Sequence, residues 1–272
     1  MIRRVLHIAL LGALLLGEAH AKPAPTKVTL QLKWKHQFQF AGYYMAKARG
    51  LYRDAGLDVT IVPGGPTVDV VDRVVSGKAD FGVGTSALLL DYARGKPVVV
   101  LGVIYQHSPL VLVMTRTKPA HTVAELVGQT VMIEKHSGDI RAMLKLDGVG
   151  LDKLRVVPHS GTVEELIQGK VKAITAYLTD EPYLLDQRGH RYTVFNPRSR
   201  GVDFYGDNFF THRRLLQQDP KLVKRFRDAT IAGWKLALQH PEEAIQLIHR
   251  QYSKRKTVAH LRFEAQRTRY LM

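Results

Sequence analysis

Runs typical of β-strands alternate with runs typical of helices along most of the chain, and this alternation constrains the fold more than any other feature. The predicted elements of the first part are, in order, strand 28–32, helix 41–55, strand 57–62, helix 68–76, strand 79–83, helix 87–94, and strands 98–105 and 110–115. Strands joined through helices pair in parallel, with the helices packed on the faces of the sheet. The sequence therefore predicts an α/β fold with a mostly parallel sheet.

A second unit with the same alternation begins after Pro119. Its predicted elements are, in order, a short helix at 123–128, strand 130–134, helix 138–146, strand 154–158, helix 162–168, strand 171–177, a helix after Pro182 and strand 192–195. We expect the last strand to return the chain to the first unit. From Asp219 the pattern is helical, over 220–239, 241–252 and 257–270, and the last segment lacks a Gly, Asn or Pro stop signal.

The N-terminus has the pattern of a secretory signal peptide. Two arginines precede an almost wholly apolar run at 5–17, and Ala19-His20-Ala21 fits the cleavage site, so residues 1–21 are the predicted signal peptide. The apolar run is shorter than the ~20 residues that a membrane-spanning helix needs. Because the chain has no cysteine, a lipid-modified cysteine and a disulfide scaffold are both excluded. These features favour a soluble protein of the bacterial periplasm.

The formal net charge of +16 raises the question of a nucleic-acid partner. Lysine and arginine are, however, spread along the chain, with only short clusters such as Lys254-Arg255-Lys256. Export of the protein from the cytoplasm also disfavours a nucleic-acid partner. A basic surface that aids solubility, attracts anions or touches the membrane is the preferred interpretation.

The stretch 33–57, KWKHQFQFAGYYMAKARGLYRDAGL, places aromatic, amide and imidazole side chains where the first predicted strand meets a helix. In open α/β sheets, ligands bind at the carboxyl ends of the strands. Aromatic faces and polar edges suit a flat ligand that carries heteroatoms. The alternative is that Trp34, Phe38 and Phe40 belong to the core while His36 and Gln37 are solvated. The cluster as a whole favours a binding site.

Motifs for catalysis, phosphate binding and metal binding are absent from the sequence. The glycine-rich turns at 64–65 and 82–85 lack P-loop or dinucleotide spacing, the histidines show no paired metal-ligand spacing, and there is no G-x-S-x-G elbow. Thr85 and Ser137 each begin a predicted helix, where free N–H groups can face a ligand or simply receive an N-cap. The sequence thus predicts binding, with no catalytic residue, no metal and no cofactor.

Several segments resemble the NMT1/THI5-like family of ABC-transporter substrate-binding proteins, which includes relatives of the thiamine-precursor binding protein. The segments are WKHQFQFAGYYMAKARGLYRDAGLDV, GKADFGVGTSALLL, GKVKAITAYLTDEPYLLDQRG, DFYGDNFF and GWKLALQHPEEA, and the resemblance spans 27–272. It implies a type II periplasmic binding protein fold, in which two α/β lobes joined by crossover strands close like a hinge on a ligand in the central cleft. We assign lobe one to 27–116 plus 195–272 and lobe two to 117–194.

The resemblance also implies the site residues. They are Trp34, His36 and Gln37 on the first loop, Tyr44 on the first helix, Thr85 and Ser137 at helix starts, Tyr177 and Glu181 in A-Y-x-T-x-E-P, and Asp207 and Asn208 in Y-G-D-N. Trp34 or Tyr177 would supply a stacking face. The Glu181 carboxylate can accept hydrogen bonds from an exocyclic amine and a ring N–H. Its alternative role is to stabilise the dipole of its own helix.

The function implied is that of a monomeric periplasmic binding protein of an ABC importer. Its partners would be a thiamine-precursor pyrimidine or a similar small planar ligand and a permease in the inner membrane, with no nucleic acid. Eukaryotic pyrimidine synthases of the family use a cysteine-rich motif with iron, so the lack of cysteine disfavours an enzyme. The alternative is the extracytoplasmic sensor domain of a truncated diguanylate cyclase or histidine kinase.

Overall fold

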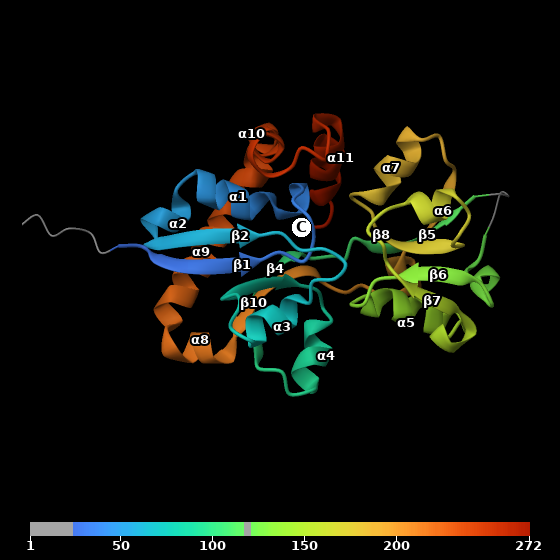
Figure 1. Ribbon diagram of the computed structural model, residues 1–272, viewed down its shortest axis with the longest axis horizontal. Helices are drawn as coiled ribbons and strands as arrows, with labels where there is room; N and C mark the ends of the chain where they lie inside the picture. The colour runs from blue at the N-terminus through green and yellow to red at the C-terminus, as the bar shows by residue number, and fades with distance from the viewer. Residues whose placement is uncertain (1–23, 117–120) are drawn as a thin grey trace, which may run out of the picture.

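The computed structural model describes residues 24–116 and 121–272, so the predicted signal peptide lies outside the described residues. The strands form two five-stranded sheets that lie side by side along the long axis of the molecule (Figure 1). Sheet A has the order β2-β1-β3-β10-β4 and sheet B the order β7-β6-β8-β5-β9. We call the part of the protein around each sheet lobe one and lobe two. The α/β class predicted from the alternation is confirmed.

The strands of sheet A are β1 (Thr26–Gln31), β2 (Leu57–Val62), β3 (Phe81–Gly84), β4 (Val98–Tyr105) and β10 (Gly206–His212). Those of sheet B are β5 (Leu110–Thr115), β6 (Thr130–Ile133), β7 (Arg155–Pro158), β8 (Ala173–Tyr177) and β9 (Tyr192–Phe195). The α-helices are α1 (Ala41–Ala48), α2 (Leu51–Asp54), α3 (Val70–Val75), α4 (Leu88–Ala93), α5 (Gly138–Leu146), α6 (Glu164–Ile167), α7 (Glu181–Gln187), α8 (Arg213–Gln218), α9 (Pro220–Gln239), α10 (Pro241–Leu247) and α11 (Val258–Thr268). Short 3₁₀ or π turns occupy η1 (Phe38–Phe40), η2 (Val123–Leu126), η3 (Leu151–Lys153), η4 (Pro197–Arg200) and η5 (Ile248–Tyr252).

Both sheets are mixed, and the prediction of mostly parallel sheets is wrong. β1 pairs in parallel with β2 and β3, and β6 with β7 and β8, but β10 and β5 pair antiparallel with both of their neighbours. The cause is the path of the chain: β5 follows β4 of the other sheet, and β10 follows β9 of the other sheet. Neither strand enters through the helical crossover that makes neighbouring strands parallel.

This path also corrects the predicted division of the chain. The strand β5, assigned to lobe one by the boundary at 116, pairs with β8 and β9 in sheet B. The strand β9, expected to return the chain to the first unit, also stays in sheet B, and the return is made by β10, which the sequence analysis did not predict. The chain therefore passes between the sheets at 106–109 and 196–205.

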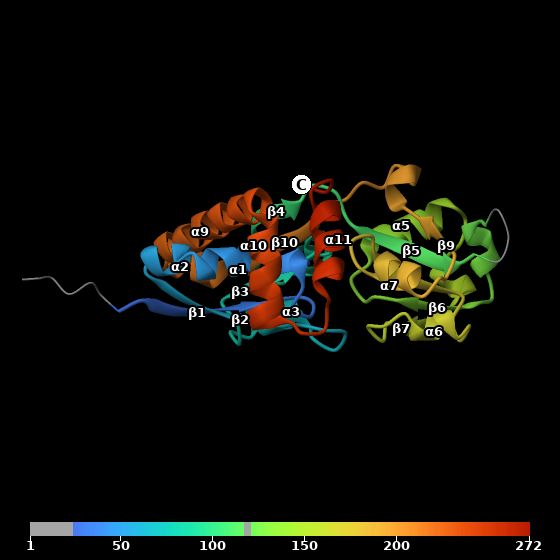
Figure 2. The same cartoon turned by 90° about the horizontal axis from the view of Figure 1, so that it is seen from above.

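Lobe one is held by helices on both faces of sheet A. On one face α1, α2 and α9 pack together (Figure 2), and the rings of Phe81 and Phe226 stack with centroids 3.7 Å apart. On the other face Phe210 packs with Val70 and Val74 of α3. Phe209 and Phe210 of β10 thus serve opposite faces, as the alternation of side chains along a strand requires.

Glycine permits the close contact between α1 and α9. A Cβ at Gly233 would lie 2.3 Å from the carbonyl oxygen of Gly42, and one at Gly42 would lie 2.1 Å from the indole of Trp234. Only hydrogen atoms fit in these spaces, so the helices can approach to backbone contact. In the part of the chain that the structure describes, no helix is long and apolar enough to cross a membrane.

Candidate ligand-binding site

A cavity of about 470 Å³ opens between the two sheets. From lobe one it is lined by residues that follow β1, β2 and β3, and from lobe two by residues at the ends of β6 and β7. All five are parallel strands, so the cavity lies at the carboxyl ends of both sheets, where open α/β sheets bind ligands. Its volume lies in the range of small-molecule sites.

Two rings form an aromatic wall of this cavity. Trp34 and His159 both line it and meet edge to face, with ring centroids 6.1 Å apart. His159 receives the Gly161 N–H at Nδ1 (2.8 Å), so its Nε2 carries the proton that is donated to the Thr175 carbonyl (2.8 Å). Burial lowers the pKa of His159. The neutral ring is therefore held in place by hydrogen bonds between both nitrogens and backbone groups. The surface of the ring can contact a ligand in the cavity.

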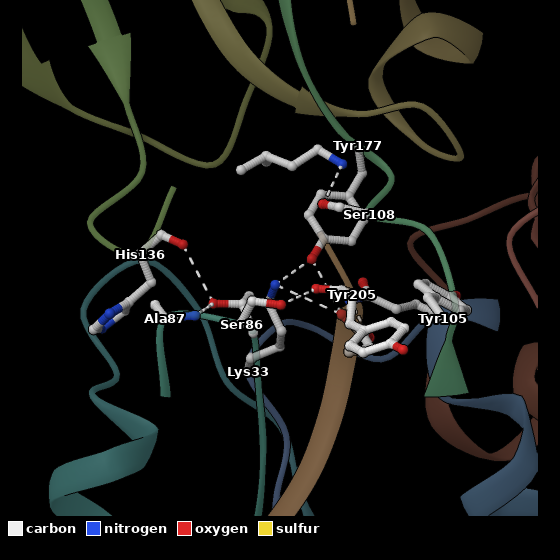
Figure 3. Close-up of polar contacts among 12 residues, drawn as sticks. Lys33, Ser86, Ala87, Tyr105, Ser108, His136, Tyr177 and Tyr205 are labelled. Atoms are coloured by element: carbon white, nitrogen blue, oxygen red, sulfur yellow. Dashed lines mark hydrogen bonds and ion pairs between the residues drawn. The ribbon is translucent and has the colours of Figure 1, made fainter. Parts of the chain in front are cut away.

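Polar contacts join the lobes along the cavity. The Lys135 ammonium lies 2.7 Å from the Asp69 carboxylate, and Thr85 Oγ1 donates to the carbonyl oxygen of His136 (3.3 Å). Figure 3 shows His136 facing the first residues of the segment that leads into α4, near Ser86 and Ala87. The loop after β3 and the loop after β6 thus meet across the cleft.

A buried network closes the inner end of the cleft. Lys33 donates to the hydroxyl of Tyr177, which donates to Asp207 Oδ1 (3.1 Å), and Figure 3 shows Lys33 and Tyr177 pointing toward one another. Gln39 Nε2 donates to the other oxygen of Asp207 (2.7 Å), and Gln37 Nε2 donates to Gln39 (2.6 Å). Asp207 has φ +25°, a backbone conformation that is uncommon for residues other than glycine. Burial raises the pKa of Asp207, and the Lys33 charge opposes that rise.

Glu181 lies beside this network, at a second cavity of about 20 Å³ that Gln37 and Tyr177 also line. Its Oε2 accepts the N–H of Tyr177 (2.7 Å). Burial, together with the charge of Asp180, raises the pKa of Glu181 to about 8. The carboxyl group is therefore largely protonated at neutral pH.

Asp180, next to Glu181 in sequence, belongs to a different cluster. Its carboxylate lies 2.6 Å from the Lys256 ammonium and 2.9 Å from His260 Nε2, and Lys256 also contacts Glu264. Burial alone would raise the pKa of Asp180, but Lys256 and His260 lower it to about 2. The arrangement of Asp180, His260 and Glu264 is one that could hold a cation, and here the Lys256 ammonium supplies the positive charge.

The structure brings some of the predicted site residues to the cavities and places others elsewhere. Trp34 and Thr85 line the larger cavity, and Trp34, Gln37, Tyr177 and Glu181 line the smaller one. Asp207 lines neither cavity but holds Tyr177 and Lys33 in place. The face of the Tyr177 ring carries the Lys33 ammonium, 4.5 Å from the centroid, so Trp34 is the better placed of the two expected stacking residues.

Besides Asp207, four predicted residues line neither cavity, because their side chains are used in packing. His36 Nδ1 lies 2.9 Å from the Tyr44 hydroxyl, and Tyr44 stacks on Tyr252 at 4.1 Å. Ser137 is fully buried and donates to the carbonyl of Glu134 (2.6 Å), and Asn208 is buried within β10. The site role predicted for them stays a prediction.

Glu134 and His159 are among the residues of the larger cavity that were not predicted. Glu134 follows β6 and is the last residue of the predicted strand 130–134, and His159 directly follows both β7 and the predicted strand 154–158. The strand-end rule that favoured a binding site in the stretch with Trp34 could have found them too.

Comparisons with solved structures agree on the fold. The aliphatic sulphonate binding protein SsuA of Escherichia coli superimposes with a TM-score of 0.67 at 17% identity, covering 89% of this chain and 83% of that one. The Candida albicans gene product CA3427 is described as having the generic periplasmic binding protein fold. It superimposes with a TM-score of 0.68 at 18% identity, covering 91% of this chain and 81% of that one. The protein has the fold of a periplasmic binding protein of type II, as the resemblance implied.

Sequence comparisons identify relatives along most of the chain. The riboflavin-binding protein RibY of Chloroflexus aurantiacus is 28% identical over 84% of this chain and 67% of its own. The formylaminopyrimidine-binding protein of Halalkalibacterium halodurans is 24% identical over 91% of this chain and 77% of its own. A relative from Legionella pneumophila is named 4-amino-5-hydroxymethyl-2-methylpyrimidine phosphate synthase. It is 23% identical over 82% of this chain and 73% of its own. The family model described as NMT1/THI5 like matches residues 37–244, and the chain belongs to the NMT1/THI5-like family.

Proposed function

We propose that the protein is the periplasmic substrate-binding component of an ABC importer and that it binds a small, planar, nitrogen-containing molecule without changing it chemically. The observation that carries the proposal is the cavity of about 470 Å³ between the lobes, with Trp34 and the ring of His159 in its wall. Aromatic surfaces with a few polar groups at their edges suit a flat heterocycle.

The named relatives support this class of ligand. Riboflavin and formylaminopyrimidine are both planar nitrogen heterocycles, and they are the ligands named for two relatives that span most of the chain. Within this class a thiamine-precursor pyrimidine remains our first candidate. The larger cavity also offers more volume than a single pyrimidine ring occupies.

The binding role is proposed without an enzymatic one, even though some relatives are named as synthases. The chain has no cysteine, and the one histidine in the aromatic wall has both of its nitrogens engaged by backbone groups. We further propose that the protein acts as a monomer in the periplasm and delivers its ligand to a permease in the inner membrane.

Intrinsic fluorescence tests the proposal, because the chain has two tryptophans and only Trp34 lines the cavity, whereas Trp234 is buried against α1. Titration with 4-amino-5-hydroxymethyl-2-methylpyrimidine or formylaminopyrimidine should give a saturable change in emission. In Trp34→Phe that change should disappear, while Trp234 still reports an intact fold. If neither these pyrimidines nor riboflavin gives a saturable response in the wild-type protein, the proposed function is wrong.

A further inference from the structure

Glu134 occupies a fixed position where the two cavities meet. It follows directly on β6 and lines both the larger and the smaller cavity. Its N–H donates to Thr175 Oγ1 (3.0 Å), and its carbonyl accepts the hydroxyl of Ser137 (2.6 Å). Because the backbone is anchored on both sides, the start of the side chain is held at the wall of the cleft.

The other charged groups that line the cavities are compensated within the protein. The pairs are Asp69 with Lys135 (2.7 Å), Asp91 with Lys96 (3.3 Å), Lys33 with Asp207 (3.7 Å) and Asp180 with Lys256 (2.6 Å). Glu181 accepts a backbone N–H. The carboxylate of Glu134, by contrast, accepts no hydrogen bond and forms no ion pair with any residue in 24–116 or 121–272.

The field of this unpaired charge reaches the inner residues. Burial is the main cause that raises the pKa of Tyr177, and the charges of Asp207 and then Glu134 raise it further. Glu134 likewise adds to the rise in the pKa of Asp207, after burial. Glu134 therefore contributes negative charge toward the inner end of the cleft, and no cation among the described residues forms an ion pair with it.

We infer that Glu134 selects the ligand by charge: the bound molecule presents an N–H donor, from an amine, an amidine-like group or a ring nitrogen, to this carboxylate. A partly buried carboxylate is stabilised by N–H donors and by positive charge. An anionic group at the same place would meet an uncompensated negative charge, and both lysines of the cavity wall are already paired. The inference rests on the proposed function. It narrows the ligand class to molecules that carry an N–H donor and excludes anions such as sulfonates.

Glu134→Gln tests the inference, because glutamine keeps the shape and one acceptor oxygen while it removes the charge. In calorimetric titrations with 4-amino-5-hydroxymethyl-2-methylpyrimidine, the variant should bind about ten- to a hundredfold more weakly than the wild-type protein, as expected for a lost hydrogen bond to a charged group. The sulfonate MOPS should bind the wild-type protein weakly or not at all, and its relative affinity should rise in the variant.

Glu164→Gln is the matched control. It removes a carboxylate of the same lobe that lines neither cavity and is paired with the exposed Arg188. Its affinity should stay within about threefold of wild type, the range expected from weak exposed ion pairs. An equal loss in both variants would assign the effect to the general charge of lobe two and overturn the role of Glu134.

The ligand-free proteins give an independent readout. Since the carboxylate of Glu134 has no hydrogen-bond or ion-pair partner among the described residues, Glu134→Gln should melt at the same temperature as wild type or higher. A lower midpoint together with unchanged affinity would make Glu134 a structural residue and refute the inference, while the proposed function would stand. If the wild-type protein binds MOPS but none of the heterocycles, both the proposed function and the inference fail.

Discussion

Glu181 is the residue whose protonation connects most directly to stability. Its pKa in the folded protein is about 8, against an ordinary value of 4.5, and burial is the main cause. A carboxyl group with a raised pKa stabilises the fold fully below its ordinary pKa and loses that contribution as the pH rises through the raised value. The wild-type protein should therefore lose stability relative to Glu181→Gln between about pH 5 and pH 9. Urea unfolding of both proteins at pH 5, 7 and 9 measures the difference, and parallel profiles would contradict it.

The same variant addresses the anchor role that the sequence suggested for Glu181. A protonated carboxyl group and a carboxamide offer similar groups to a ligand, and one oxygen of Glu181 is already taken by Tyr177. At pH 7 we therefore expect Glu181→Gln to weaken binding of 4-amino-5-hydroxymethyl-2-methylpyrimidine less than Glu134→Gln does. Calorimetry on the two variants decides the order, and the reverse order would return the anchor role to Glu181.

Among the elements, the contact of α1 with α9 depends most strongly on single residues. A methyl group at Gly233 would meet the backbone of α1 at 2.3 Å, so Gly233→Ala forces the helices apart in spite of the higher helix propensity of alanine. We expect a loss of about 1–3 kcal/mol in the free energy of unfolding, as for other overpacked cores. Chemical denaturation provides the measurement. Gly138→Ala is the control, because a Cβ at Gly138 has no neighbour within 4 Å and its stability should not fall.

Elements with clear end signals could be predicted from the sequence. The predicted range of α9 agrees with the structure, because Asp219 caps the Leu222 N–H, Pro220 occupies the first turn and Pro241 starts the next helix. The predicted helix 41–55 is instead divided into α1 and α2 at Gly50, which adopts a left-handed conformation (φ +73°). Propensity alone does not show whether such a glycine ends a helix.

β10 could not be predicted in this way, since what makes it a strand is tertiary structure. Its sequence GDNFFTH has a glycine, an aspartate and an asparagine at the start, which are typical of turns. The segment is a strand because it lies between β3 and β4 and is buried nearly throughout. The same path through the molecule decides that β5 and β9 belong to sheet B, and no local pattern encodes it.

At the scale of the whole molecule, a buried ionic cluster ties lobe two to the C-terminal helix. Asp180 lies just before α7, whereas Lys256, His260 and Glu264 lie on or just before α11, and Figure 2 shows α11 between the two lobes. Tyr183 of α7 also stacks on His260, with centroids 4.3 Å apart. The cluster is thus placed to fix the position of α11 against lobe two.

Removal of the Lys256 ammonium from this cluster should destabilise the protein strongly. Lys256→Met removes the ammonium that contacts the buried carboxylates of both Asp180 and Glu264, and breaking a buried pair in this way costs about 3–5 kcal/mol. Thermal and urea unfolding at pH 7 measure the loss. In the control Lys224→Met, which breaks an exposed i,i+4 pair with Asp228, the change should stay within about 0.5 kcal/mol. Similar losses in the two variants would mean that the cluster does not join the lobes energetically.

The ligand class is the central claim, and calorimetric titration of the wild-type protein against a panel of pyrimidines, riboflavin, amino acids, polyamines and aliphatic sulfonates tests it most directly. The account predicts one binding site per chain and the tightest binding for a planar heterocycle that carries an N–H donor, held between Trp34 and the charge of Glu134. Tight binding of an aliphatic sulfonate, with no response to any pyrimidine or to riboflavin, would contradict it.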